Sequence, residues 1–185
     1  NDEYFPRKVM FLDENGSFLP NTEERIMFYC KGVIETVKKL GWSPEIIHCQ
    51  GWFSALIPMY IKKIYNQDPL FKDTKVIFNV YDSEYKGLID PVIVEKLLFE
   101  NNLNPSDLYL LKKPTFENLC KFAISYSDAI IQGSKNINKK VLSYMKESNL
   151  PFMEYPGEEN YEDQYNNFFD SLVEQKELEL TEEKE

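Results

Sequence analysis

Short apolar runs alternate with stretches of helical periodicity along most of this 185-residue chain, and this alternation restricts the possible folds more than any other feature. The apolar runs occupy residues 45–50, 75–81, 129–132 and, in shorter form, 151–155. Helical stretches follow or precede them at residues 21–41, 55–65, 91–100, 115–126, 137–147 and 161–173. Strands that alternate with helices of this length form right-handed βαβ units. The sequence therefore predicts an α/β fold, with a Rossmann-like parallel sheet and helices on both of its faces.

The first helix has the clearest boundaries in the sequence. Asn21 stands in the N-cap position, and Glu24 follows three residues later, at the spacing of a capping box. The apolar residues that recur at helical spacing are Ile26, Cys30, Val33, Ile34 and Val37. Gly41 supplies the C-terminal stop. Before this helix the pattern is not helical, and residues 13–16 predict a turn.

The length of the chain allows one domain with a sizeable core and is too small for two ordinary domains. We therefore expect a single α/β domain over residues 1–173. Residues 174–185 contain six Glu against two Lys, and this charge run predicts an acidic, disordered tail.

The net charge and the cysteine content restrict which partners the protein binds and in which compartment it lies. A formal net charge of −10 repels a phosphate backbone, so nucleic acid is a poor partner. No stretch approaches the roughly 20 apolar residues of a membrane helix, and the acidic start lacks an apolar signal core. Cys30, Cys49 and Cys120 form no Cys-x-x-Cys pair, which argues against a disulfide framework or a zinc site. These features predict a cytoplasmic protein without a membrane partner, a metal or a cofactor.

Polar and aromatic side chains gather where three of the predicted strands end. The carboxyl ends of parallel strands lie at one edge of a sheet, which is where ligands bind in such folds. A sugar packs its C–H face on aromatic rings while its hydroxyls bind amides and carboxylates, and these strand ends contain both aromatic and polar side chains. The same residues also suit a protein core or a protein interface. The candidate substrate-binding residues are His48, Gln50, Trp52, Tyr81, Asp82, Tyr85 and Ser134.

These residues do not form a recognisable set of catalytic side chains. His48 is the sole histidine and lies within an apolar strand, where we expect a hydrogen-bonded structural role. Cys49 follows it directly and faces the other side of the sheet, so the two form no catalytic dyad. Asp82 and Glu84 have the residue types of a glycosidase pair, but a solvated loop is the simpler interpretation. We expect no catalytic residue here, and the sequence contains no glycine-rich phosphate loop and no metal-ligand cluster.

Several sequence blocks, in the same order, resemble the glycogen synthases of bacteria and the starch synthases of plants. Residues 4–7 (Tyr-Phe-Pro-Arg), the turn at 13–16 and the run Pro-Asn-Thr-Glu-Glu-Arg at 20–25 resemble a block that opens a helix with Asp-Asn-x-x-Arg-Phe. The later matching blocks lie at residues 42–48, 52–60, 75–87 and 126–130, the second of them similar to the family's Trp-His-Thr-Ala-Leu-x-Pro-x-Tyr. The resemblance covers about residues 4–140. It implies the N-terminal, acceptor-side half of a GT-B glycosyltransferase fold without its first strands.

Departures from the family pattern bear on activity. Gly51 and Phe53 replace the Asp and the second His of the family's His-Asp-Trp-His. Tyr81 and Asp82 replace its active-site His and the following Asn. The family's Lys-x-Gly-Gly-Leu loop and its donor-binding C-terminal domain have no counterpart in these residues. The resemblance therefore implies a pseudoenzyme-like half-domain that does not transfer glucose on its own.

Two further expectations follow from the resemblance. The first strands of the family's domain precede the block at residues 4–7, so we expect an upstream segment to complete the sheet. The family's last helix returns to the N-terminal domain, and the helix predicted at 161–173 has the apolar face for that contact. Its apolar face consists of Tyr161, Tyr165, Phe168, Phe169 and Leu172. An ordinary amphipathic helix that covers a core predicts the same packing.

Three functions remain open on the sequence alone. The chain is a degenerate synthase half that retains glucan or sugar binding, or a non-catalytic protein-interaction or regulatory module, or a working transferase whose donor domain is a separate chain. The corresponding partners are a glucan or nucleotide-sugar, a protein, and a second polypeptide. Glucan affinity separates the first from the second, and rescue of activity by a partner chain identifies the third.

Overall fold

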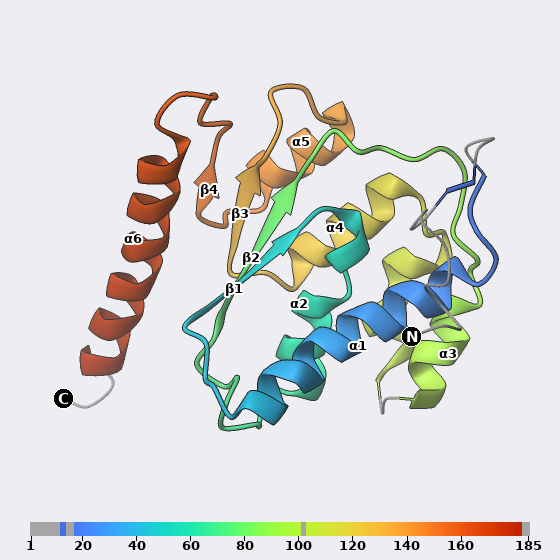
Figure 1. Ribbon diagram of the computed structural model, residues 1–185, viewed down its shortest axis with the longest axis horizontal. Helices are drawn as coiled ribbons and strands as arrows, with labels where there is room; N and C mark the ends of the chain where they lie inside the picture. Colours follow the sequence, from blue (N-terminus) through green and yellow to red (C-terminus); the bar gives the residue numbers. More distant parts are fainter. Residues whose placement is uncertain (1–11, 14–16, 101–102, 183–185) are drawn as a thin grey trace.

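The computed structural model describes residues 12–13, 17–100 and 103–182, and within them one parallel sheet organises the fold (Figure 1). Its strands are β1 (Ile46–Gln50), β2 (Lys75–Val80), β3 (Ala129–Gln132) and β4 (Phe152–Met153). They lie in the order β1-β2-β3-β4, and every pairing is parallel. The α/β fold and all four predicted strands are thus confirmed.

Helices occupy the segments between the strands, close to the predicted ranges. The α-helices are α1 (Thr22–Leu40), α2 (Ile57–Met59), α3 (Ile93–Glu100), α4 (Phe116–Ser125), α5 (Lys139–Glu147) and α6 (Tyr161–Glu182). Segments of other helix types are η1 (Trp52–Ser54), η2 (Tyr60–Ile64) and η3 (Pro105–Lys112). Segment η3 was not predicted from the sequence. It begins with a capping box between Asn104 and Asp107. Within the described residues, no helix has the length and apolar character needed to cross a membrane.

The start of α1 differs from the prediction. Asn21 adopts a left-handed conformation with φ 58°, and its side chain makes no capping hydrogen bond. A capping side chain needs an extended backbone at the N-cap, so the predicted capping box cannot form here. Glu24 instead binds Lys96 Nζ at 2.5 Å, and Glu23 binds the same nitrogen at 2.8 Å. The predicted end is confirmed, because the N–H of Gly41 bonds to the carbonyl of Lys38.

At the end of the chain, helix α6 runs to Glu182. Residues 174–182 are rich in Glu, Gln, Lys and Leu, which are strong helix formers. The disorder expected for the acidic tail at residues 174–185 stays a prediction. Residues 4–7 and 14–16, which carry part of the family resemblance, lie outside the described residues.

The two faces of the sheet are covered differently. Right-handed crossovers between strands in sequential order bring every connecting helix to one face. On that face Val76, Phe78 and Ile130 join the large core with α1 to α5. On the opposite face α6 is the one helix of the described residues that lies against the sheet (Figure 1), and it packs Leu172 against Ile77 and Ile131. Helices therefore lie on both faces, as predicted, and β1 has a strand neighbour on one side only among the described strands.

Candidate functional site

The face of the sheet under α6 changes from apolar to polar along the strands. Side chains alternate between faces along a strand, so Ile77, Asn79 and Tyr81 share this face. The pairing aligns Gln50 with Asn79 at the polar end of the rows. Phe168, Phe169 and Leu172 of α6 lie with the apolar rows, whereas the beginning of α6 lies beside the polar ones.

A cavity of about 710 Å³ lies at this polar end, between the carboxyl ends of the strands and the beginning of α6. Its lining residues are His48, Gln50, Tyr81, Gly133, Tyr155, Pro156, Gly157, Glu158, Tyr161, Glu162, Tyr165 and Asn166. The volume is in the range of small-molecule sites, and the place is where parallel sheets bind ligands. Three predicted site residues, His48, Gln50 and Tyr81, therefore meet in one cavity.

A chain of hydrogen bonds fixes the floor of the cavity. The side-chain amide of Asn79, which is fully buried, donates to the hydroxyl of Tyr165 at 2.8 Å and to that of Tyr81 at 3.1 Å. Tyr81 Oη in turn donates to Gln50 Oε1 at 3.3 Å. Burial raises the pKa of both tyrosines, so their hydroxyls stay protonated at neutral pH. The network links β1, β2 and α6 and holds polar groups at the cavity wall.

Gly133 allows this network to pack under the loop that follows β3. A Cβ at this position would lie 2.1 Å from Asn79 Oδ1 and 2.8 Å from Tyr81 Cε1. The Gly133 N–H bonds to the carbonyl of Val80 at 2.8 Å, which continues the sheet ladder past β3. Only glycine leaves room for the buried amide at this point.

His48 lines the cavity from β1 without a hydrogen bond at one of its nitrogens. Its ring packs against Phe169 at 5.4 Å and Tyr165 at 5.8 Å between ring centroids. Nε2 is buried and has no hydrogen-bond partner among the described residues, so the expected hydrogen bond is not made at this nitrogen. Burial lowers the pKa of His48, so the neutral imidazole prevails at pH 7. Cys49 lies in the core on the other face, so the predicted separation of this pair is confirmed.

Asp82 and Ser134 lie beyond the cavity and bind each other. Ser134 Oγ donates to Asp82 Oδ1 at 3.1 Å and accepts from the backbone N–H of Asp82 at 3.2 Å. Glu84 binds elsewhere, because its carboxylate accepts from Asn138 Nδ2 at 3.1 Å. The two carboxylates thus have separate partners in exposed loops, as the solvated-loop interpretation predicts.

Trp52 and Tyr85 lie in the core and not at the strand-end rim. Each is 6% exposed, and their rings meet edge to face at 4.8 Å. Gly51, with φ 71°, turns the chain after β1 so that Trp52 points inward, where Phe18 contacts both rings. The Tyr85 hydroxyl donates to the carbonyl of Pro114, which satisfies it in the core. The structure therefore does not bring these two predicted site residues into the cavity.

The second wall of the cavity was not predicted from the sequence. That wall consists of residues 155–166, from the loop after β4 to the second turn of α6. Tyr161 and Tyr165 were predicted as a helix face, but their position over the strand ends depends on long-range packing. Asn79 was also not predicted as a site residue. It lies two residues before Tyr81 along the chain, so both side chains point to the same face of the sheet, and this spacing could have identified it.

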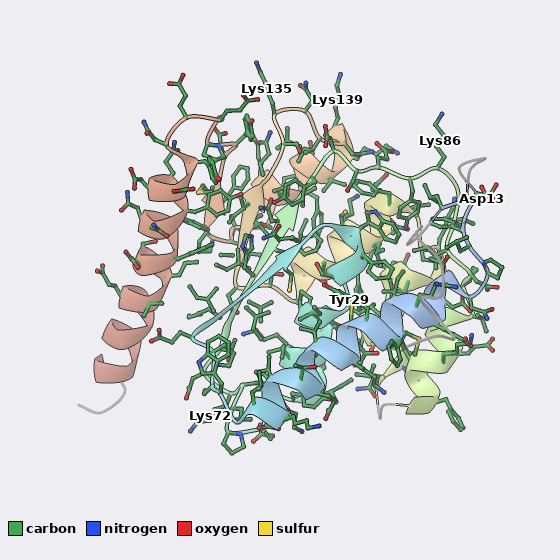
Figure 2. The ribbon with its side chains drawn as sticks, in the orientation of Figure 1. Asp13, Tyr29, Lys72, Lys86, Lys135 and Lys139 are labelled. Carbon is green, nitrogen blue, oxygen red and sulfur yellow. The ribbon has the colours of Figure 1, made fainter. Side chains whose placement is uncertain are left out.

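The electrostatics of the cavity favour neutral or cationic ligands. Two of its lining residues are Glu158 and Glu162, and none of the described residues that line it is Lys or Arg. Lys135 and Lys139 follow β3 but point away into solvent (Figure 2). The three cysteines are buried and free, and burial raises the pKa of each thiol, that of Cys30 to about 12, so all three stay protonated at neutral pH.

The chain is similar to glycogen synthases over part of their length. It is 31% identical to the glycogen synthase of Geotalea daltonii over 145 residues, which are 77% of this chain and 29% of that protein. It is 33% identical to glycogen synthase 2 of Geobacter metallireducens over 146 residues, again 77% of this chain and 29% of the relative. The glycogen synthase of Pelodictyon phaeoclathratiforme is 39% identical over 101 residues, 54% of this chain and 21% of that protein. The chain thus spans less than a third of these relatives.

A solved structure shares the fold. The catalytic domain of starch synthase IV from Arabidopsis thaliana, bound to ADP and acarbose, superposes with a TM-score of 0.61 and 16% identity, over 83% of this chain and 32% of that one. This likeness supports the assignment of the sheet and its helices to one half of a GT-B catalytic domain. The sequence pattern of the starch synthase catalytic domain matches residues 1–151, which is most of the chain, so the chain belongs to the starch synthase catalytic domain family.

Proposed function

We propose that this chain is the acceptor-side half of a glycogen/starch synthase-like glycosyltransferase, and that it binds a neutral α-glucan without transferring glucose on its own. The observation that carries the proposal is the cavity at the carboxyl ends of the strands. It offers four tyrosine rings beside amide and carboxylate acceptors. This combination suits a sugar, whose C–H face packs on rings and whose hydroxyls donate to acceptors.

The composition of the cavity supports a glucan over a nucleotide-sugar. The departing diphosphate in glucose transfer needs cationic groups, and loss of one such contact costs about 2–4 kcal/mol of barrier. Here Glu158 and Glu162 stand at the cavity instead. In addition, Tyr81 occupies the place of the family's active-site His. These features favour binding without catalysis in the 185-residue chain.

Cellular location and completion of the sheet belong to the same proposal. The three free thiols fit a reducing compartment, and we place the protein in the cytoplasm. Strand β1 is paired on one side among the described strands, and an additional segment pairing with its other side remains our prediction.

Calorimetric titration of the chain with maltoheptaose tests the proposal. We expect saturable binding that is weakened about tenfold or more in Tyr81→Ala and Gln50→Ala, since each removes groups from the cavity. Tyr109→Ala is the matched control, because Tyr109 is 70% exposed on η3 and does not line the cavity. Absence of heat at millimolar sugar would contradict the proposal and favour the protein-interaction module.

A further inference from the structure

The second wall of the cavity lies outside the family match. That match ends at residue 151, and the wall begins at Tyr155. Eight of the cavity-lining residues belong to it: Tyr155, Pro156, Gly157, Glu158, Tyr161, Glu162, Tyr165 and Asn166. In a two-domain transferase the ligand cleft needs two bodies to close around it. In this chain one continuous segment faces the strand ends.

We infer that segment 155–166, which lies beyond the family match, is a second ligand-binding wall, with Tyr161 as a stacking platform and Glu162 as a hydroxyl acceptor for a neutral oligosaccharide. This inference rests on the proposed glucan binding and assigns to it residues that lie outside the family match.

Two hydrogen bonds and two backbone turns fix the position of the wall. The side-chain amide of Gln164 donates to the carbonyl of Pro156 at 3.0 Å and ties the loop to the first turn of α6. Gly157 and Asn160 have positive φ of 85° and 55°, which turn the chain back over the strand ends. The Asn79 amide bonds to Tyr165 at 2.8 Å and anchors the helix to β2. The wall thus has a fixed position relative to the cavity floor, as a binding surface requires.

Tyr161 is placed as a platform and not as a core residue. Its ring is perpendicular to that of Tyr165, with centroids 6.3 Å apart, so the two meet edge to face. Nearly half of its surface, 48%, stays exposed although it lines the cavity. An exposed tyrosine ring at a cavity mouth offers the flat apolar surface on which the C–H face of a sugar packs.

Glu162 supplies the polar complement beside this ring. Its described contact is a long hydrogen bond from the Tyr161 hydroxyl at 3.4 Å, which leaves acceptor capacity on the carboxylate. Glu158 stands on the same wall and adds a second negative charge. Sugar hydroxyls donate to such carboxylates in strong charge-assisted bonds, whereas a nucleotide diphosphate is repelled.

Titration of the full 185-residue chain with maltoheptaose tests the wall. We expect the dissociation constant to rise about tenfold in Tyr161→Ala and in Glu162→Gln. Tyr161→Phe should bind as the wild type does, because it keeps the ring. The matched control for the ring is Tyr109→Ala, because Tyr109 is another exposed tyrosine. The matched control for the charge is Asp163→Asn, because Asp163 is next to Glu162 but does not line the cavity. Both controls should change the affinity less than twofold.

The outcomes separate this inference from the proposed function. Unchanged affinity in Tyr161→Ala and Glu162→Gln, with loss of binding in Tyr81→Ala, would overturn the wall and leave glucan binding intact. No binding by the wild type would overturn both. Saturable binding of ADP that Tyr161→Ala abolishes would contradict the assignment to a neutral ligand.

Discussion

At the scale of single residues, the shape of the cavity floor depends on two buried neighbours, Asn79 and Gly133. The Asn79 amide holds two tyrosines, and Gly133 leaves the space that this amide occupies. Asn79 Oδ1 has no hydrogen-bond partner among the described residues, so the two hydrogen bonds that Nδ2 donates hold the amide in position. A small change at either position therefore alters both stability and the binding surface.

The substitution Gly133→Ala should destabilise the fold. The new Cβ would lie 2.1 Å from Asn79 Oδ1, and overpacking of this kind costs about 1–3 kcal/mol. Gly32→Ala is the opposite control, because Gly32 lies within α1 with no atom within 4 Å of the added Cβ, and it should stabilise by about 0.5–1 kcal/mol. Urea unfolding of both variants measures the two free energies. Equal stability of Gly133→Ala and the wild type would refute the close contact.

His48 should make stability depend on pH near neutrality. Burial lowers the pKa of the folded histidine below its ordinary value of about 6.5, so the unfolded state takes up the proton first as the pH falls. The free energy of unfolding is therefore highest above pH 6.5 and falls as the pH drops from about 6.5 toward the lower folded pKa. His48 is the sole histidine, which makes the effect assignable.

His48→Phe tests this pH dependence, because it keeps the ring contacts with Tyr165 and Phe169 and has no titrating group. Unfolding free energies at pH 7.5, 6.5 and 5.5 should fall less steeply in the variant than in the wild type. The carboxylates, which ordinarily titrate near pH 4, contribute alike to both proteins. Parallel slopes would show that His48 does not titrate differently on folding.

At the scale of elements, α6 is the one helix that covers its face of the sheet among the described residues. Leu172 is 3% exposed and packs against Ile77 and Ile131. Leu172→Ala should lower the free energy of unfolding by about 2–4 kcal/mol through lost apolar contact and a cavity. Asn167→Ala, at an exposed position of the same helix, should change it by less than about 0.5 kcal/mol. An unchanged free energy of unfolding in Leu172→Ala would contradict this packing role of α6.

Element positions were predictable where the pattern was local. The strands Ile46–Gln50 and Ala129–Gln132 follow from short apolar runs, and Gly41 ends α1 as its position implies. The cap at Asn21 was not predictable, since its side chain could form the bond only in an extended backbone.

The candidate site was also predictable only where a local sequence pattern indicated it. His48, Gln50 and Tyr81 were found because strand ends converge at one sheet edge. Trp52 and Tyr85 follow strand ends as well, but a turn at Gly51 takes Trp52 into the core, and composition cannot distinguish a buried ring from an exposed one. The wall at 155–166 depends on how α6 packs across the sheet, which no local pattern encodes.

At the scale of the whole molecule, the chain spans between 21% and 29% of the glycogen synthases cited above. We predict that the purified 185-residue chain does not transfer glucose from ADP-glucose or UDP-glucose to glycogen, because none of the described residues that line the cavity is a Lys or Arg for the leaving diphosphate. Incorporation of labelled glucose measures this directly, with a two-domain glycogen synthase as the positive control. Turnover by the chain alone would contradict the account.

Chemical-shift mapping of the ¹⁵N-labelled chain with maltoheptaose is the most direct test of the central claim, that a glucan binds at the carboxyl ends of the strands. We predict saturable shifts of the amides of Gln50, Tyr81 and Gly133 and of residues 157–166, with little change along α3 and η3. Shifts confined to other surfaces, or no shifts at millimolar sugar, would contradict the assignment of this cavity as a glucan site.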